Sequence, residues 1–154
     1  MLVREIMTSN VVTIGCRDNV LDACQKYKDF SVGCLVVMDD RIIVGILTER
    51  DIIERIIVDQ RNPKRTKVED IMTKNIKTIH ASARVEQAAE MMKTYKIKKL
   101  PVILNNEIKG IVTATDITNN MPEFTKELKK LFLDEKPFRL IQKPPYVKNT
   151  IQNK

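Results

Sequence analysis

The chain has 154 residues, of which 43% are hydrophobic and 31% are charged, a composition typical of one globular body with a buried core. No apolar run approaches the ~18–20 residues that a membrane-spanning helix needs, and an acid follows early at Glu5. The sequence therefore predicts no membrane partner, no signal peptide and a cytoplasmic location. The three cysteines, Cys16, Cys24 and Cys34, are odd in number and widely spaced, which argues against a disulfide framework.

The net charge of +7 is unevenly distributed along the chain. Residues 1–121 carry 19 Lys and Arg against 16 Asp and Glu, whereas residues 122–154 carry 8 against 4. The nearly balanced first part argues against a body that coats nucleic acid. The basic excess of the last part leaves open a tail that contacts nucleic acid or a partner protein.

An internal repeat with an offset of 65 residues dominates the sequence. The segment 3–10, Val-Arg-Glu-Ile-Met-Thr-Ser-Asn, falls on 68–75, Val-Glu-Asp-Ile-Met-Thr-Lys-Asn, and the register continues without a gap. Between residues 3–55 and 68–120, 18 of 53 pairs are identical, where unrelated pairs of average residue usage would give about three. The chain therefore contains two copies of one structural unit.

Periodicity and turn residues predict five elements within the first copy. In chain order they are an extended run, a helix, the two strands of a hairpin and a second helix: 11–14, 20–30, 34–38, 42–47 and 49–58. Asp18 or Asn19 is positioned to cap the first helix. The second helix is expected to bury four isoleucines on its inner face: Ile52, Ile53, Ile56 and Ile57. The second copy repeats the pattern, with its last helix cut short before Pro122.

The predicted fold class is α+β, with two βαββα-type motifs packed as a pseudo-two-fold pair and a C-terminal helical and extended tail. One unit cannot cover both sides of a small sheet, but two units packed sheet to sheet can, with ligand sites in the clefts at their interface. The predicted divisions are motif 1, a linker, motif 2 and the tail: 1–58, 59–67, 68–121 and 122–154.

The segments Gly45–Asp51 and Gly110–Asp116 carry the most informative motif, because each runs from a strand into a helix start. A glycine permits close approach of a backbone or a ligand, and a threonine hydroxyl with a helix N-terminus suits a phosphate. An aspartate three residues further on suits the diol of a ribose. The alternative is a plain helix cap formed by Thr48 and Asp51. Repetition of the motif together with Thr13 and Thr78 favours the ligand-binding interpretation.

These motifs resemble those of a CBS domain. The residues that carry the resemblance are Asp70-Ile-Met-Thr, Lys99-Leu-Pro-Val102 and Gly110-Ile-Val-Thr-Ala-Thr-Asp116, with Glu5-Ile-Met-Thr and Gly45-Ile-Leu-Thr-Glu-Arg-Asp51 in the first copy. The resemblance covers about residues 1–121 and implies a Bateman module of two motifs. Such modules commonly pair into a disc of four motifs, so a homodimer is expected, with AMP, ADP, ATP or S-adenosylmethionine in the clefts.

The resemblance implies a set of ligand-binding residues in the two copies. They are Thr13, Ile14, Thr48, Arg50, Asp51, Thr78, Ile79, Lys99, Pro101, Thr113 and Asp116. The two aspartates would hold ribose hydroxyls, and the threonines of the same turns would contact phosphate or ribose. Thr13 and Thr78 would line the base or phosphate side, while Arg50 and Lys99 are phosphate candidates. The copies differ around these positions, so the two sites need not bind equally.

The predicted function is regulatory: adenine-nucleotide sensing that is signalled to an unknown effector protein, with no cofactor required. No catalytic residue, no metal site and no enzymatic activity are expected, since His80 is the only histidine and no Ser/His/Asp set is present. The alternatives are an S-adenosylmethionine sensor, a purely structural dimerisation module, and a nucleic-acid-binding protein acting through its tail. In that tail, Phe124, Leu128, Leu131 and Phe132 share one helical face, which also suits docking on the chain's own body.

Overall fold

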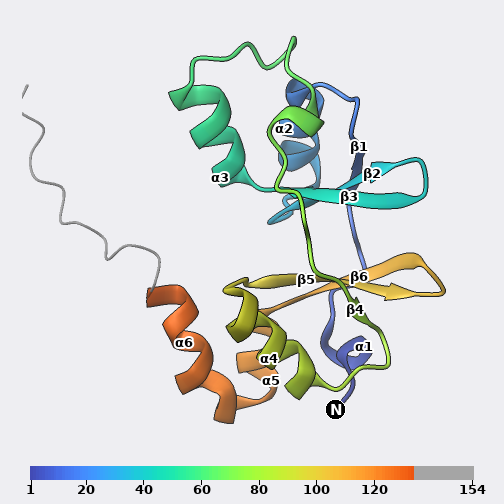
Figure 1. Ribbon diagram of the computed structural model, residues 1–154, viewed down its shortest axis with the longest axis vertical. Helices are drawn as coiled ribbons and strands as arrows, with labels where there is room; N and C mark the ends of the chain where they lie inside the picture. The colour runs from blue at the N-terminus through green and yellow to red at the C-terminus, as the bar shows by residue number, and fades with distance from the viewer. Residues whose placement is uncertain (134–154) are drawn as a thin grey trace, which may run out of the picture.

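The computed structural model describes residues 1–133 and contains two three-stranded sheets that face each other between layers of helices (Figure 1). The strand orders are β1-β2-β3 and β4-β5-β6, so each copy builds its own sheet. The predicted α+β class and the pairing of two βαββα units are confirmed. Helices α2 and α3 cover the outer face of the first sheet, while α4, α5 and α6 lie on the outer side of the second.

The first copy follows the predicted order of elements closely. It contains β1 (Thr13–Gly15), α2 (Val20–Phe30), β2 (Leu35–Asp39), β3 (Ile42–Leu47), α3 (Glu49–Ile52) and a π-helical segment over Ile53–Val58. Strands β1 and β2 are parallel, and β2 and β3 form an antiparallel hairpin. Of the two predicted caps, Asn19 is the one used, because its Oδ1 accepts a hydrogen bond of 2.9 Å from the Asp22 amide.

The second copy repeats this arrangement and adds a helix. Its elements are β4 (Ile79–His80), α4 (Val85–Tyr95), β5 (Lys99–Leu104), β6 (Glu107–Thr113) and α5 (Ala114–Asn120), followed by a 3₁₀ turn (Pro122–Phe124) and α6 (Thr125–Leu133). The early end of α5 before Pro122 is as predicted. Each copy begins with a short helical segment before its first strand. These segments are α1 (Val3–Ile6) and a 3₁₀ turn (Val68–Asp70).

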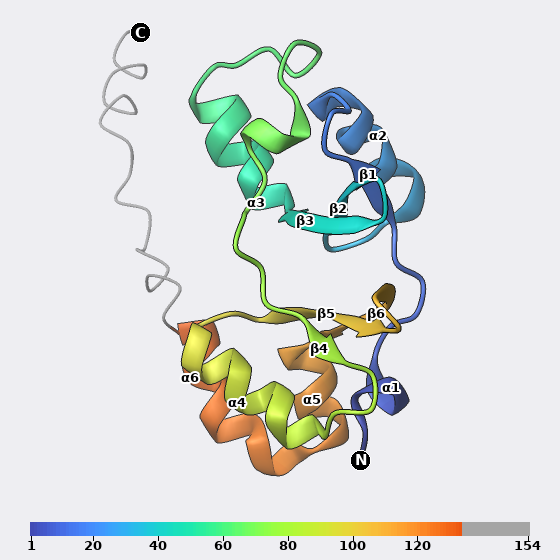
Figure 2. The same cartoon turned by 45° about the vertical axis from the view of Figure 1, so that its right-hand side comes forward.

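Each of these N-terminal segments packs on the other copy, so the two cores are interlinked. Val3 is fully buried in the core of the second copy, where its amide donates to the Ala83 carbonyl at 2.9 Å. Val68 and Ile71 are fully buried in the core of the first copy. The chain then passes from one sheet to the other over residues 7–12 and 72–78, which we call the crossing segments (Figure 2).

Gly45 and Gly110 allow the crossing segments to approach the sheets. A Cβ added at Gly110 would lie 2.9 Å from the Thr8 carbonyl oxygen, and one at Gly45 would lie 2.9 Å from that of Thr73. Thr8 and Ile111 exchange two backbone hydrogen bonds of 2.9 Å beside Gly110. The close approach predicted at these glycines is therefore made by the backbone of the other copy's N-terminal segment.

The prediction that Ile53 and Ile57 are buried is wrong. Their exposed fractions are 57% and 67%, whereas Ile56 is only 2% exposed and Ile52 is half-buried. Ile52 and Ile56 face the core, while Ile53 and Ile57 each lie one residue further along the helical segment and face another side. Because no described element packs on that outer face, the isoleucine run has one buried side and one exposed side.

Helix α6 docks on the chain's own second copy. Leu128 is fully buried and Leu131 is 8% exposed, both within the core that contains α4 and α5. Lys93 of α4 donates a hydrogen bond of 3.0 Å to Glu127, which raises the pKa of the Lys93 amine. Docking on the chain's own body is thus confirmed for this helix, while the Phe132 side chain and the extended part of the tail lie outside the described residues.

Candidate ligand clefts

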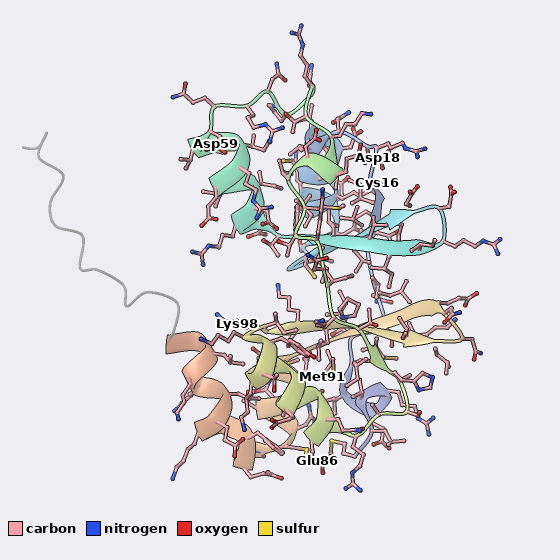
Figure 3. All side chains as sticks on the ribbon, in the orientation of Figure 1. Cys16, Asp18, Asp59, Glu86, Met91 and Lys98 are labelled. Atoms are coloured by element: carbon pink, nitrogen blue, oxygen red, sulfur yellow. The ribbon has the colours of Figure 1, made fainter. Side chains whose placement is uncertain are left out.

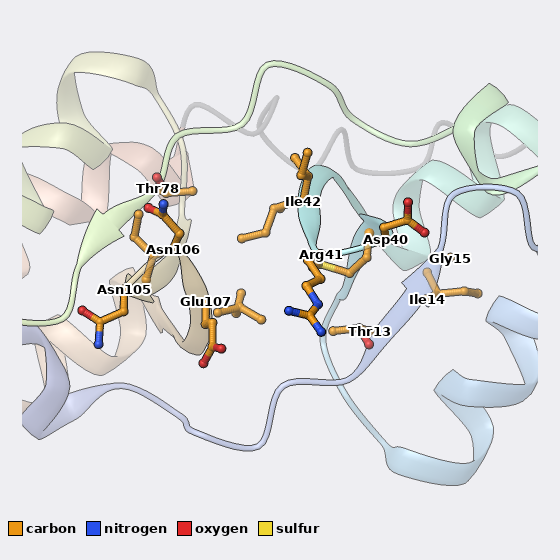
Figure 4. A pocket seen from close by; sticks show the side chains of 14 residues that line it. Thr13, Ile14, Gly15, Asp40, Arg41, Ile42, Thr78, Asn105, Asn106 and Glu107 are labelled. Carbon is orange, nitrogen blue, oxygen red and sulfur yellow. The ribbon is translucent and has the colours of Figure 1, made fainter.

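A cleft of about 1160 Å³ opens between the two sheets at the turns of their hairpins (Figure 4). Thr13, Ile14 and Thr78 of the predicted ligand-binding set line it. The floor is largely aliphatic, and Arg41 and Glu107 lie on facing sides. Lys109 donates a hydrogen bond to Glu107 and lowers the pKa of its carboxyl group, and the charge of Arg41 acts in the same direction.

The cleft lies where the two copies meet, because equivalent positions line it from both sides. The pairs at the 65-residue offset are Thr13 with Thr78, Met38 with Ile103, Asp40 with Asn105, Arg41 with Asn106, Ile42 with Glu107 and Ile43 with Ile108. In the sequence, Asp40 and Arg41 fall between the predicted strands 34–38 and 42–47, which marks them only as turn residues. Their place in a cleft follows from the pairing of the sheets, which no local pattern encodes.

The first Thr–Asp turn, Thr48–Asp51, is a closed network of hydrogen bonds. The Asp51 amide donates to Thr48 Oγ1 at 3.2 Å, while the Thr48 amide and hydroxyl donate to Asp51 Oδ2 at 2.9 and 3.0 Å. Asp51 Oδ1 accepts from the Thr73 hydroxyl at 3.3 Å and lies 3.8 Å from Arg55 Nη1. Asp51 is only 7% exposed, so both carboxylate oxygens are engaged in a nearly buried site.

The second Thr–Asp turn, Thr113–Asp116, has the same cap but fewer other contacts. The Thr113 amide and hydroxyl donate to Asp116 Oδ2 at 2.8 and 2.7 Å, and the Asp116 amide donates to Thr113 Oγ1 at 3.1 Å. Within residues 1–133 these are the contacts of the Asp116 carboxylate, and none of them uses Oδ1. Asp116 is half-buried. Its second oxygen is therefore available to a ligand hydroxyl.

The two predicted phosphate candidates already make contacts within the chain. Arg50 Nε donates to Glu54 at 2.7 Å on the surface. Lys99 pairs with Thr113 across the β5–β6 hairpin, and its Nζ donates to the Gly33 carbonyl of the first copy at 2.9 Å. Lys99 therefore lies beside the second Thr–Asp turn and bridges the two copies. Burial raises the pKa of the Cys34 thiol next to that bridge, with the Lys99 charge acting in the opposite direction.

The remaining predicted residues are structural parts of the sheets. Ile79 is 5% exposed and belongs to the core of the second copy. Pro101 is buried in β5 opposite Ile111. Lys98 directly precedes β5, at the edge of the space between the sheets (Figure 3). The candidate set thus divides into a central cleft, two Thr–Asp turns and a group of core residues.

Residues 1–133 contain neither a membrane-spanning helix nor a cluster of metal-binding side chains. No helix in this range is long and apolar enough to cross a membrane. The same residues also contain no group of three or more His, Cys, Asp or Glu side chains placed to hold a metal ion.

Two facing βαββα units with interlinked cores and paired Thr–Asp turns define a tandem α+β repeat module. The chain belongs to the CBS domain family, whose model matches residues 3–58 and 68–123. The predicted resemblance to a tandem CBS pair is therefore confirmed. Proteins built on such pairs are typically regulatory ligand-sensing modules and are generally not catalytic.

Relatives and solved structures agree with this assignment. The chain is 31% identical over 118 residues to an uncharacterised protein, YlbB, of Bacillus subtilis, which covers 75% of this chain and 79% of that one. It is 36% identical over 120 residues to the mitochondrial CBS domain-containing protein CBSX3 of Arabidopsis thaliana, covering 74% of this chain but only 58% of that one. A CBS domain protein of unknown function from Thermoplasma acidophilum superposes with a TM-score of 0.75 at 28% identity, over 86% of this chain and 75% of that one.

Proposed function

We propose that the protein senses adenine nucleotides, binding AMP, ADP or ATP between its CBS motifs and signalling the bound state to a partner protein. The observation that supports this most directly is the second Thr–Asp turn, where the half-buried Asp116 keeps Oδ1 available beside Thr113 and Lys99. A carboxylate oxygen suits a ribose hydroxyl, and an ammonium group suits a phosphate. Signalling would follow from different affinities for two arrangements of the copies.

The charges around the turn favour a phosphate-bearing ligand over S-adenosylmethionine. Lys98 and Lys99 directly precede the buried part of β5, and the Ala114 amide donates to the Lys98 carbonyl at 2.9 Å, which holds the turn against them. The Lys99 ammonium group beside the turn attracts a phosphate and repels a sulfonium cation. We therefore rank adenine nucleotides above the sulfonium ligand.

Adding AMP, ADP or ATP is expected to raise the melting temperature of the full chain. A ligand that binds only the native state at 100 times its Kd stabilises that state by about 2.7 kcal/mol. Differential scanning fluorimetry with the three nucleotides measures the shift, with adenosine as the control that lacks phosphate and S-adenosylmethionine as the competing ligand. No shift with any nucleotide contradicts the proposal, and a shift with S-adenosylmethionine alone selects the alternative sensor.

Two further parts of this proposal concern location and the tail. We propose a cytoplasmic location, although the Arabidopsis relative is described as mitochondrial. Nucleic-acid binding through the tail depends mainly on residues after Leu133, which lie outside the described part of the chain, so it stays a prediction. Retention on RNA that weakens steeply with salt and is lost on truncation after Leu133 would favour it.

We also propose that the protein self-associates as a homodimer through the exposed side of the first copy's last helical segment. Ile53, Ile57 and Val58 have exposed fractions of 57%, 67% and 68%. The second copy has Thr118, Pro122 and Glu123 at these positions, and α6 docks beside them. A contiguous apolar surface on one copy alone suits burial against a second chain. A CBS-CP12 protein of cyanobacteria, which superposes with a TM-score of 0.71, is itself hexameric.

Changing Ile53 and Ile57 together to glutamate is expected to reduce the solution mass to that of one chain. A charge in the buried centre of an interface leaves an unpaired, desolvated group, which strongly opposes association. Light scattering coupled to size-exclusion chromatography measures the mass, and Thr118→Glu at the equivalent position in the second copy is the control. An unchanged oligomer in the double variant would place the interface elsewhere.

A further inference from the structure

The two Thr–Asp turns share a sequence pattern but differ in what holds their carboxylates. In the first, Asp51 Oδ2 is bonded to Thr48, and Oδ1 faces both the Thr73 hydroxyl at 3.3 Å and Arg55 Nη1 at 3.8 Å. With Asp51 only 7% exposed, a ribose diol could reach this carboxylate only by displacing a hydroxyl and a guanidinium. The first turn is therefore occupied by the protein's own groups.

Arg55 is fixed in this position by the start of the second crossing segment and by the residue that precedes it. Its Nη1 donates to the carbonyl oxygens of Ile71 and Met72 at 2.6 and 3.1 Å. One guanidinium nitrogen thus lies among two backbone carbonyls and the Asp51 carboxylate. Charge-assisted hydrogen bonds of this kind are stronger than neutral ones. Asp51 therefore serves to tie the crossing segment to the first copy.

In the second copy, one of the groups that close the first turn is replaced and the other does not engage the carboxylate. Asn120 stands at the position of Arg55, and its amide donates to the backbone carbonyl of Asp116 at 2.8 Å, away from the carboxylate. Thr8 stands at the position of Thr73, but its hydroxyl is not among the hydrogen-bond partners of the Asp116 carboxylate within residues 1–133. As a result Asp116 Oδ1 keeps its capacity to accept a ligand hydrogen bond.

The charged side chains near the two turns also differ between the copies. Glu49 follows Thr48 in the first turn, where the second has Ala114. Cys34 stands at the position of Lys99, which pairs with Thr113 of the second turn. The first turn also contains Arg50, which is paired with Glu54 at 2.7 Å, whereas the second turn has the Lys99 ammonium group beside it to attract an anionic phosphate. Access to the Asp116 carboxylate and the charge of Lys99 are separate observations, and both favour nucleotide binding at the second copy.

We propose that each chain binds one nucleotide, at the second Thr–Asp turn, and that the first is a permanently closed structural counterpart. Asp116 contacts the ligand, whereas Arg55 and Thr73 keep Asp51 engaged with the crossing segment. This inference rests on the proposed nucleotide-sensing function and assigns it to one of the two copies.

Isothermal titration of the full chain with AMP, ADP and ATP tests the assignment. The wild type is expected to bind one nucleotide per chain. Asp116→Asn should weaken binding at least about 10-fold, by the loss of a charge-assisted hydrogen bond, while Asp51→Asn should change it less than about 2-fold. Two nucleotides per chain, or a larger loss from Asp51→Asn than from Asp116→Asn, would overturn the assignment.

Asn120→Arg provides a second test that leaves the buried first turn intact. It places a guanidinium four residues after Asp116, as Arg55 stands after Asp51, and is expected to weaken nucleotide binding at least about 10-fold. Asn119→Arg, which adds the same charge to the same exposed helix end, is the matched control and should stay within about 2-fold of wild type. Equal affinities for the two variants would contradict the role assigned to Arg55.

Failure of the assignment and failure of the proposed function give different results. If the wild type binds none of the three nucleotides, the nucleotide-sensing function fails. The structural role of Asp51 can still be tested by thermal unfolding without ligand. Asp51→Asn should then lower the melting temperature clearly more than Asp116→Asn. Equal shifts in the two variants would show that Asp51 is not a structural tie, and would overturn the inference on its own.

Discussion

Replacing Gly110 with alanine is expected to lower the free energy of unfolding by about 1–3 kcal/mol, the usual cost of forcing an extra carbon into a packed site. The new Cβ would lie 2.9 Å from the Thr8 carbonyl oxygen and 2.5 Å from Met7 Sδ. The methionine side chain can move aside, but the carbonyl belongs to a crossing segment that exchanges two hydrogen bonds with Ile111. Chemical denaturation measures the loss.

Gly33→Ala is the matched control for this substitution. Its Cβ would meet only the flexible end of Lys99, at 3.3 Å, and Gly33 has no positive φ that would strain a side chain. The control should therefore stay within about 0.5 kcal/mol of wild type. If Gly110→Ala is equally mild, the first crossing segment is held less tightly against the sheet than its hydrogen bonds indicate.

Leu128→Ala is expected to cost about 2–5 kcal/mol of stability, the range for a fully buried leucine that leaves a cavity. Leu128 is completely buried between α6 and the helices of the second copy. The loss should appear as a lower midpoint in denaturation followed by circular dichroism. Lys129→Ala, on the exposed side of the same helix, controls for helix propensity. Similar midpoints for the two variants would mean that α6 contributes little to the core.

Elements governed by local patterns were predictable from the sequence. Val20–Phe30 and Ile42–Leu47 match the predicted bounds because each combines a clear periodicity with a cap or a turn. The two Thr–Asp turns were predictable for the same reason, since a capping box is encoded within four residues. Ile53 and Ile57 failed because four isoleucines in six positions do not show which side of a helix faces the core.

Features that depend on pairing between the copies could not be predicted from the sequence. The repeat alignment places Val3 at the start of the first copy, yet nothing local indicates that it enters the second core. Likewise, Arg41 falls in the turn between two predicted strands, and only the facing of the two sheets brings it to one cleft with Asn106. The closed state of Asp51 depends on Thr73, which lies 22 residues further along the chain. Such contacts are set by tertiary packing, which residue spacing does not encode.

The exchange of N-terminal segments has a consequence for synthesis of the chain. Translation produces Val3 among the first residues, but the core that buries it also contains Leu128 and Leu131 of α6. The first copy is also incomplete on a nascent chain until Val68 and Ile71 have emerged from the ribosome. Because contacts distant in sequence slow folding, the two copies cannot fold independently in the order of their synthesis. Folding should therefore be one cooperative, largely post-translational event.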